Sequence, residues 1–143
     1  MLDEKELIYF LDSSTLIHAI DKSAEYQKEC LNVINKAAKG IINTATSLET
    51  LEETLFILSK LVSLSTALRV AHNYLRMTKI KKYELTLNVF ENALEIMEIT
   101  PLNRPKDAIN VATMLAHGIS KIVSEDKEYD KVNLIQRVHP KDV

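Results

Sequence analysis

The chain has 143 residues, of which 46% are hydrophobic, with 18 Lys and Arg against 20 Asp and Glu and a net charge of −2. This length fits one domain, 1–143, with a sizeable core, and the charge balance argues against bulk electrostatic capture of nucleic acid. Only two glycines and one cysteine are present, which excludes a glycine-built phosphate loop and an intrachain disulfide. No apolar stretch is long enough to cross a membrane and the first residues lack a basic signal segment, so we expect a cytoplasmic protein with no membrane partner.

The predicted elements alternate between short apolar runs rich in β-branched and aromatic residues and longer segments with helical periodicity. Ser23, Thr46 or Ser47, and Thr86 are N-cap candidates, and Gly40 ends a helix. In chain order we predict a strand at 7–12, helices at 16–20 and 23–38, a strand at 41–45, helices at 46–61 and 65–76, a short strand at 79–85, helices at 86–97 and 104–117, and strands at 119–124 and 133–138.

This alternation favours a three-layer α/β/α fold, with a central, mainly parallel sheet of four to five short strands covered by helices on both faces. The alternative is a mainly helical protein with Asp12 in a loop, since most of residues 46–98 has helical periodicity. The apolar runs at 7–12, 41–45 and 121–124 argue against that alternative.

Acidic residues recur at the expected ends of elements. Each alone has an ordinary explanation as a cap, a turn residue or an acid on an exposed helix face. The carboxyl ends of parallel strands and the starts of the following helices share one edge of a sheet, so we expect these acids to converge there. They are Asp12 after the first strand, Glu52 and Glu53 early in a helix, Asp107 in the helix that Pro105 opens, and Asp126 with Asp130 after the strand ending at Ser124.

Converging carboxylates repel one another and need a cation to remain ionised. Hard oxygen ligands of this kind suit Mg²⁺ or Mn²⁺, and no His or Cys spacing indicates zinc. We expect the four histidines, at 18, 72, 117 and 139, and Cys30 to be surface, boundary or core residues rather than ligands. A magnesium or manganese site at a sheet edge suits hydrolysis of a phosphodiester, and no Ser/His/Asp or Cys/His nucleophile set is visible.

Four segments, in this order, resemble the PIN domain family, especially its small VapC-like members. No single segment is specific, and the resemblance rests on all four occurring in this order with suitable spacing. They are the opening strand and Asp-x-Ser at 9–16, a segment similar to Thr-Leu-x-Glu at 46–55, an Asp-Ala helix start at 104–113, and a closing Ser-x-Asp with an aromatic residue three positions on, at 122–130.

The resemblance implies a metal-dependent endoribonuclease whose acidic cluster is Asp12, Glu53, Asp107 and Asp126, with Asp12, Asp107 and Asp126 as metal ligands. The remaining candidates are supporting or RNA-contacting residues, and the basic ones rest on charge alone. Ser14, Ser124, Glu52 and Asp130 are the supporting candidates, and Arg104, Lys106, Lys81 and Lys82 are the candidates for holding the RNA backbone.

Several alternatives remain open. Glu52 competes with Glu53 as the second acid, and Glu125 stands where the family commonly has Asn. The chain is interpreted either as a ribonuclease, acting as the toxin of a toxin–antitoxin pair bound by an antitoxin protein, or as a non-catalytic PIN-like RNA- or protein-binding module. The apolar runs at 55–58 and 61–62 suit a partner protein, and the family resemblance implies a homodimer.

Overall fold

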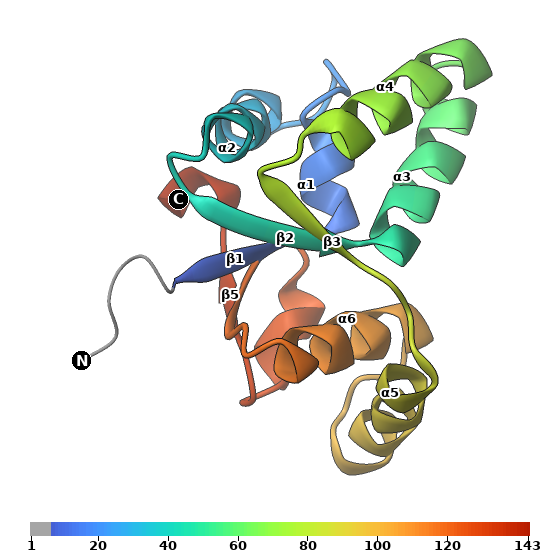
Figure 1. Ribbon diagram of the computed structural model, residues 1–143, viewed down its shortest axis with the longest axis vertical. Coiled ribbons are helices and arrows are strands. Elements are labelled where there is room, and N and C mark those ends of the chain that lie inside the picture. Colours follow the sequence, from blue (N-terminus) through green and yellow to red (C-terminus); the bar gives the residue numbers. More distant parts are fainter. Residues whose placement is uncertain (1–6) are drawn as a thin grey trace.

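The computed structural model describes residues 7–143, and it confirms the three-layer α/β/α architecture (Figure 1). The first residues, which suggested the absence of a signal segment, lie outside this range. The sheet has five strands in the order β3-β2-β1-β4-β5, and each neighbouring pair is parallel. The strands are β1 (Ile8–Leu11), β2 (Asn43–Ser47), β3 (Ile80–Tyr83), β4 (Lys121–Val123) and β5 (Gln136–Val138).

Helices cover both faces of this sheet. The first four lie on one face and the next two on the other, as Figure 1 shows. They are α1 (Ser13–His18), α2 (Gln27–Lys39), α3 (Leu48–Leu61), α4 (Leu64–Arg76), α5 (Leu87–Ile99) and α6 (Pro105–Ala116), and the short 3₁₀ helices η2 (Lys127–Lys131) and η3 (Pro140–Asp142) follow near the C-terminus.

The strand order places β1 at the centre of the sheet. The chain moves outward from β1 to β2 and β3, and then crosses back to β4 on the other side of β1. The carboxyl end of β1 is therefore the point where the winding direction reverses, which is where open parallel sheets leave a crevice for ligands. This topology, more than any local sequence feature, selects the place for a site.

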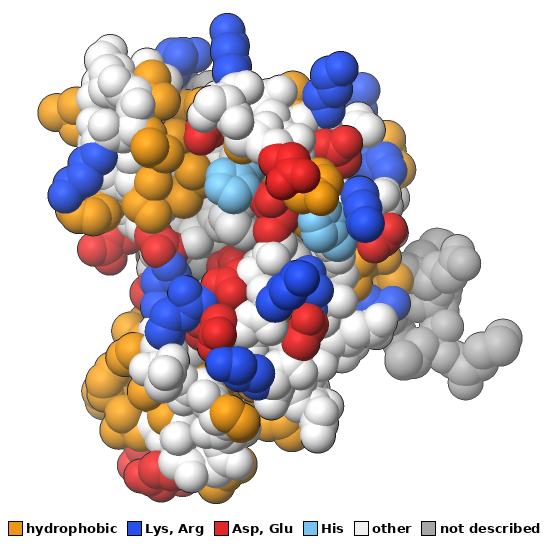
Figure 2. Space-filling view, turned by 180° about the vertical axis from the view of Figure 1, so that it is seen from behind, with side chains coloured by type: hydrophobic (Ala, Val, Ile, Leu, Met, Phe, Trp, Pro, Cys, Tyr) orange, Lys and Arg blue, Asp and Glu red, His pale blue; other side chains and the backbone are white. Residues whose placement is uncertain are grey.

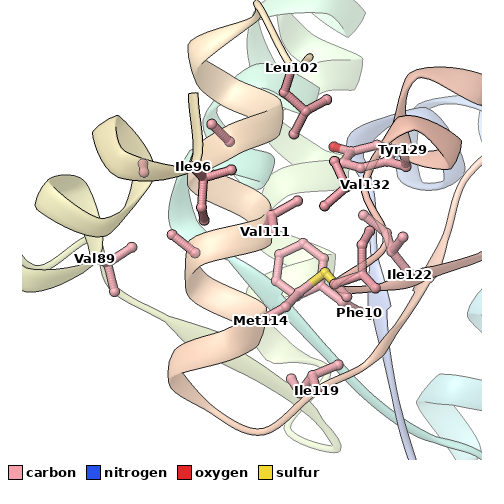
Figure 3. Close-up of a cluster of buried hydrophobic side chains, with 14 of the residues drawn as sticks. Phe10, Val89, Ile96, Leu102, Val111, Met114, Ile119, Ile122, Tyr129 and Val132 are labelled. Atoms are coloured by element: carbon pink, nitrogen blue, oxygen red, sulfur yellow. The ribbon is translucent and has the colours of Figure 1, made fainter. Parts of the chain in front are cut away.

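The core is divided by the sheet, because successive side chains of a strand point to opposite faces. Phe10 of β1 is completely buried against α5 and α6, beside Val111 and Ile122 (Figure 3). Its neighbour Leu11 is completely buried on the other face, in the cluster formed with α1 to α4. A β1 strand buried on both faces is what the uninterrupted apolar run predicts.

The second strand starts two residues later than predicted. Gly40 has a φ of 72° and ends α2, with its N–H donating to the Ala37 carbonyl at 3.1 Å. The next N–H, from Ile41, donates to the Lys36 carbonyl at 2.9 Å. This pair of bonds is a Schellman motif, so Ile41 belongs to the helix end and not to the strand.

The prediction that Ser23 caps the helix expected at 23–38 is wrong. Its N–H and Oγ both bond to Asp21 Oδ1, at 3.0 and 2.7 Å, in a separate turn. The helix begins four residues later, after Tyr26, which provides no side-chain cap. Ser47, by contrast, does cap α3, since its Oγ accepts from the Thr50 N–H at 3.2 Å.

Other predicted elements are present with boundaries shifted by a few residues. The short helix predicted at 16–20 is α1, which already begins at Ser13 because Asp12 caps it. The last predicted strand, at 133–138, is limited to β5. Among residues 7–143, no helix has the length and hydrophobicity needed to cross a membrane.

We predict that Phe10→Ala lowers the free energy of unfolding by about 3–5 kcal/mol, because it removes a completely buried ring and leaves a cavity. Phe56→Ala is the matched control, since that ring is 57% exposed, and we expect it to cost less than about 1 kcal/mol. Chemical denaturation of both variants measures the difference. Equal losses would contradict this description of the core.

Candidate active site

Asp12 lies at the carboxyl end of β1 and is only 4% exposed. Its Oδ1 accepts a hydrogen bond from the Ser13 N–H at 2.9 Å, which caps α1. Its Oδ2 accepts one from the hydroxyl of Ser124, after β4, at 2.7 Å, and the hydroxyl of Ser14 lies 3.3 Å away. The two predicted supporting serines therefore both contact this carboxylate.

Asp107 reaches the same place from the other face of the sheet. Pro105 is well suited to the first turn of α6, and Asp107 follows it in that turn with 5% exposure. Its Oδ2 accepts a hydrogen bond from Arg104 Nε at 2.7 Å. Its Oδ1 lies 3.2 Å from the phenol oxygen of Tyr129.

A buried polar bridge, which the sequence interpretation missed, connects the two aspartates. The Tyr129 hydroxyl oxygen lies 3.2 Å from Asp107 Oδ1 and 3.4 Å from Asp12 Oδ1. It also accepts a hydrogen bond from Asn110 Nδ2 at 2.9 Å. Both Tyr129 and Asn110 are completely buried. Two signals were available: Asn110 is a polar residue on the apolar side of α6, three residues after Asp107, and Tyr129 is the aromatic residue of the closing segment.

Asp126 and Glu53 complete the group at the rim. The Asp126 N–H donates to Ser124 Oγ at 3.0 Å, and its carboxylate forms an ion pair with Arg104. Glu53 of α3 forms an ion pair with Lys106. Figure 2 shows acidic side chains with Lys and Arg beside them in the hollow between the helical layers. The pocket has a volume of about 480 Å³ and is lined by Asp12, Ser13, Ser14, Ile17, His18, Glu53, Ile57, Leu61, Arg104, Lys106, Asp107 and Asp126.

Burial makes the two central aspartates harder to ionise. Desolvation raises the pKa of Asp12, and the hydrogen bonds from Ser124 and Ser13 only partly oppose this effect. Desolvation also raises the pKa of Asp107, opposed by Arg104 and reinforced by the neighbouring carboxylates. The Tyr129 pKa is raised by desolvation and by the two aspartates, so it remains a neutral phenol.

The remaining predicted residues lie outside this pocket. Glu52 is exposed and borders a neighbouring pocket that Glu53 also lines, but only Glu53 of the two lines the main one. Asp130 accepts a hydrogen bond from Arg137 Nε at 2.9 Å. Lys81 and Lys82 lie on the edge strand β3, and the Lys82 ammonium donates to a backbone carbonyl at the end of α4.

The sequence profile of the PIN domain family matches residues 9–134, a span that includes all four acidic positions of the pocket. The chain belongs to the PIN domain family. Among curated protein sequences, none matches this PIN domain significantly.

Solved structures share the fold of this PIN domain at low sequence identity. VapC20 of Mycobacterium tuberculosis, described as a sarcin-ricin loop cleaving toxin, is 19% identical with a TM-score of 0.73, covering 86% of this chain and 92% of that one. VapBC2 of Rickettsia felis, bound to a DNA fragment from its promoter, is 15% identical with a TM-score of 0.72, covering 93% and 98%. FitAcB of Neisseria gonorrhoeae is 10% identical with a TM-score of 0.72, covering 96% and 100%.

The raised pKa values of Asp12 and Asp107 predict how the free energy of unfolding depends on pH. A carboxyl group whose pKa is higher in the folded state binds protons more tightly there, so stability falls as pH rises from its ordinary value of 3.8 through the raised value. We expect Asp12→Asn, which stays neutral, to be more stable than the wild type at neutral pH without metal.

Denaturant unfolding in the presence of a chelator, repeated between acidic and neutral pH, measures this effect. The difference in unfolding free energy between Asp12→Asn and the wild type should grow as pH rises, and added Mg²⁺ should stabilise only the wild type. A difference that does not depend on pH would contradict the electrostatic argument.

Proposed function

We propose that this PIN domain is a metal-dependent endoribonuclease that hydrolyses RNA phosphodiester bonds in the cytoplasm. The observation that supports it most strongly is the gathering of four acids, from four separate segments, around one pocket at the switch point of the sheet. Asp12 and Asp107 are the inner pair, and Glu53 and Asp126 lie at the rim.

The inner residues suit a hard divalent cation. Asp12 and Asp107 are nearly inaccessible, lie close enough to contact the same Tyr129 hydroxyl, and have raised pKa values. Two such carboxylates ionise together only with a positive charge between them, and all the donors are oxygens, as Mg²⁺ or Mn²⁺ prefers. When bound, such an ion supplies an activated water and stabilises negative charge on the phosphate. Asp12, Asp107 and Asp126 would hold it.

The protein's own residues have distinct roles in this proposal. Ser124 donates to Asp12 and accepts from the Asp126 N–H, so one hydroxyl positions two acids. Arg104 and Lys106 line the pocket with exposed or half-buried side chains, and each is paired with an acid of the site. In this proposal their guanidinium and ammonium groups bind phosphate oxygens of the RNA backbone.

We predict that Asp12→Asn and Glu53→Gln reduce cleavage of defined RNAs in Mn²⁺ to background, since each removes an acid of the pocket. Glu52→Gln is the matched control, because this exposed neighbour on the same helix does not line the pocket, and we expect it to retain wild-type cleavage. Gel analysis of end-labelled RNA gives the rates. Persistent cleavage by Asp12→Asn would overturn the assignment, and loss in Glu52→Gln alone would reverse the choice between the two glutamates.

We also propose that the nuclease is a toxin held inactive by an antitoxin protein. The α3–α4 surface, formed by Phe56, Leu61, Val62, Leu64 and Leu68, leaves these side chains 44–61% exposed. Leu61 also lines the pocket, so a partner on this surface would lie at the mouth of the site. Figure 2 shows hydrophobic side chains gathered at this end of the molecule. A toxin–antitoxin complex from Klebsiella pneumoniae shares the fold, with 14% identity and a TM-score of 0.67, which is consistent with this proposal. The homodimer stays a prediction.

We predict that expression of this chain without a partner arrests bacterial growth, and that Asp12→Asn abolishes the arrest at equal protein level. Colony counts after induction, with immunoblots for expression, measure it. Normal growth with abundant wild-type protein that cleaves RNA in vitro would exclude the toxin role and leave the nuclease proposal intact.

The alternative, a non-catalytic RNA- or protein-binding module, is favoured by one observation. Arg104 forms ion pairs with both Asp107 and Asp126, and Lys106 forms one with Glu53, so each of these acids has a cationic partner without a metal ion. Calorimetric titration with Mn²⁺ separates the two functions. Binding that is lost in Asp12→Asn supports the enzyme, and no measurable binding to the wild type supports the module.

A further inference from the structure

Beside the acidic pocket lies a second group of potential ligands from three different elements. His18 ends α1, Cys30 is in α2, and Glu125 follows β4. His18 Nδ1 and Glu125 Oε2 form a short contact, and Cys30 Sγ lies 3.8 Å from the same carboxylate oxygen. The three ligand atoms all lie within 4.8 Å of one another. Among the described residues, this is the one group in which imidazole, thiol and carboxylate meet in this way.

We propose that His18, Cys30 and Glu125 form a binding site for a divalent cation of the Zn²⁺ class, distinct from the hard-cation site at Asp12 and Asp107. Thiolate and imidazole ligands select zinc over magnesium. Zinc bonds of about 2.0–2.3 Å place two tetrahedral ligands about 3.3–3.6 Å apart, so small side-chain movements bring this group to that geometry. The inference does not depend on the nuclease proposal.

The three candidate ligands differ in their exposure to solvent. Cys30 is completely buried, whereas the side chains of His18 and Glu125 are 33% and 20% exposed. The cation would enter between the imidazole and the carboxylate and meet the sulfur at the back, and three protein ligands leave the fourth position for water. The thiol proton would pass to solvent as the sulfur binds the metal.

The same contacts make a redox role for Cys30 unfavourable. Burial and the Glu125 carboxylate raise the pKa of the thiol to about 12. A protonated, inaccessible thiol is a poor nucleophile, so the cysteine is inert in the absence of metal. The neighbouring imidazole and carboxylate instead make Cys30 suitable as one ligand of a bound metal ion.

Metal binding there would act on the loop that carries part of the acidic site. Glu125 stands between Ser124 and Asp126, and His18 lines the acidic pocket. A cation bound by the three side chains would join α1, α2 and the loop after β4 at one point. The Zn²⁺-bound protein should therefore be more resistant to unfolding than the metal-free one.

The test uses Co²⁺ and Zn²⁺ on the full chain. We predict that Co²⁺ gives a thiolate-to-metal charge-transfer band that Cys30→Ala abolishes, and that Zn²⁺ displaces the Co²⁺ at one equivalent. His18→Gln and Glu125→Gln should each weaken Zn²⁺ by at least about 10-fold in competition with a chromophoric chelator. His72→Gln, at an exposed histidine on α4, is the matched control and should bind as the wild type does.

Two results would overturn the proposal. The first is the absence of a charge-transfer band in the wild type together with equal Zn²⁺ affinities of the wild type, His18→Gln and Glu125→Gln. In that case the three side chains only form hydrogen bonds with one another. The other is Zn²⁺ binding that only Asp12→Asn removes, which would place the ion in the acidic pocket. If Cys30→Ala does not fold, the half-buried ligand variants His18→Gln and Glu125→Gln decide, with the thermal shift by Zn²⁺ as the second readout.

Discussion

The site depends on one buried carboxylate, that of Asp12, at the carboxyl end of the central strand. Taking it out of water is costly, and the Ser13 N–H and the Ser124 hydroxyl only partly compensate. Those two donors come from the start of α1 and from the segment after β4. The carboxylate therefore connects these two segments with the end of β1. The candidate metal site is organised around this group because its neighbours must satisfy it.

The polar bridge of Tyr129 and Asn110 shows how the fold accommodates a second buried acid. The phenol contacts both Asp12 and Asp107 while its ring packs in the hydrophobic cluster against α5 and α6. Side chains fixed by packing hold the carboxylates at a set separation, which is what a pre-organised ion site requires. The cost is electrostatic strain in the metal-free protein, a common trade between function and stability.

The loop after β4 contributes residues to two neighbouring sites of different chemistry. Ser124 donates to Asp12 and Asp126 lines the acidic pocket, whereas Glu125 between them contacts a histidine and a cysteine. The chain bends at Glu125, just after β4, so this short segment contributes side chains to both groups. The acid at position 125, which had no assigned role in the sequence, gains one from this geometry.

The sequence by itself determined the α/β/α fold and the places of Asp12, Asp107 and Asp126 at the ends of elements, because periodicity and element ends are local properties. Tertiary structure decided what depends on distant contacts. It separated Glu53 from Glu52, whose side chains point about 100° apart on one helix, and it left Lys81 and Lys82 on an edge strand outside the pocket. It also brought Tyr129 to Asp12 and Cys30 to Glu125, pairs 117 and 95 residues apart, which no spacing rule within one segment can reveal.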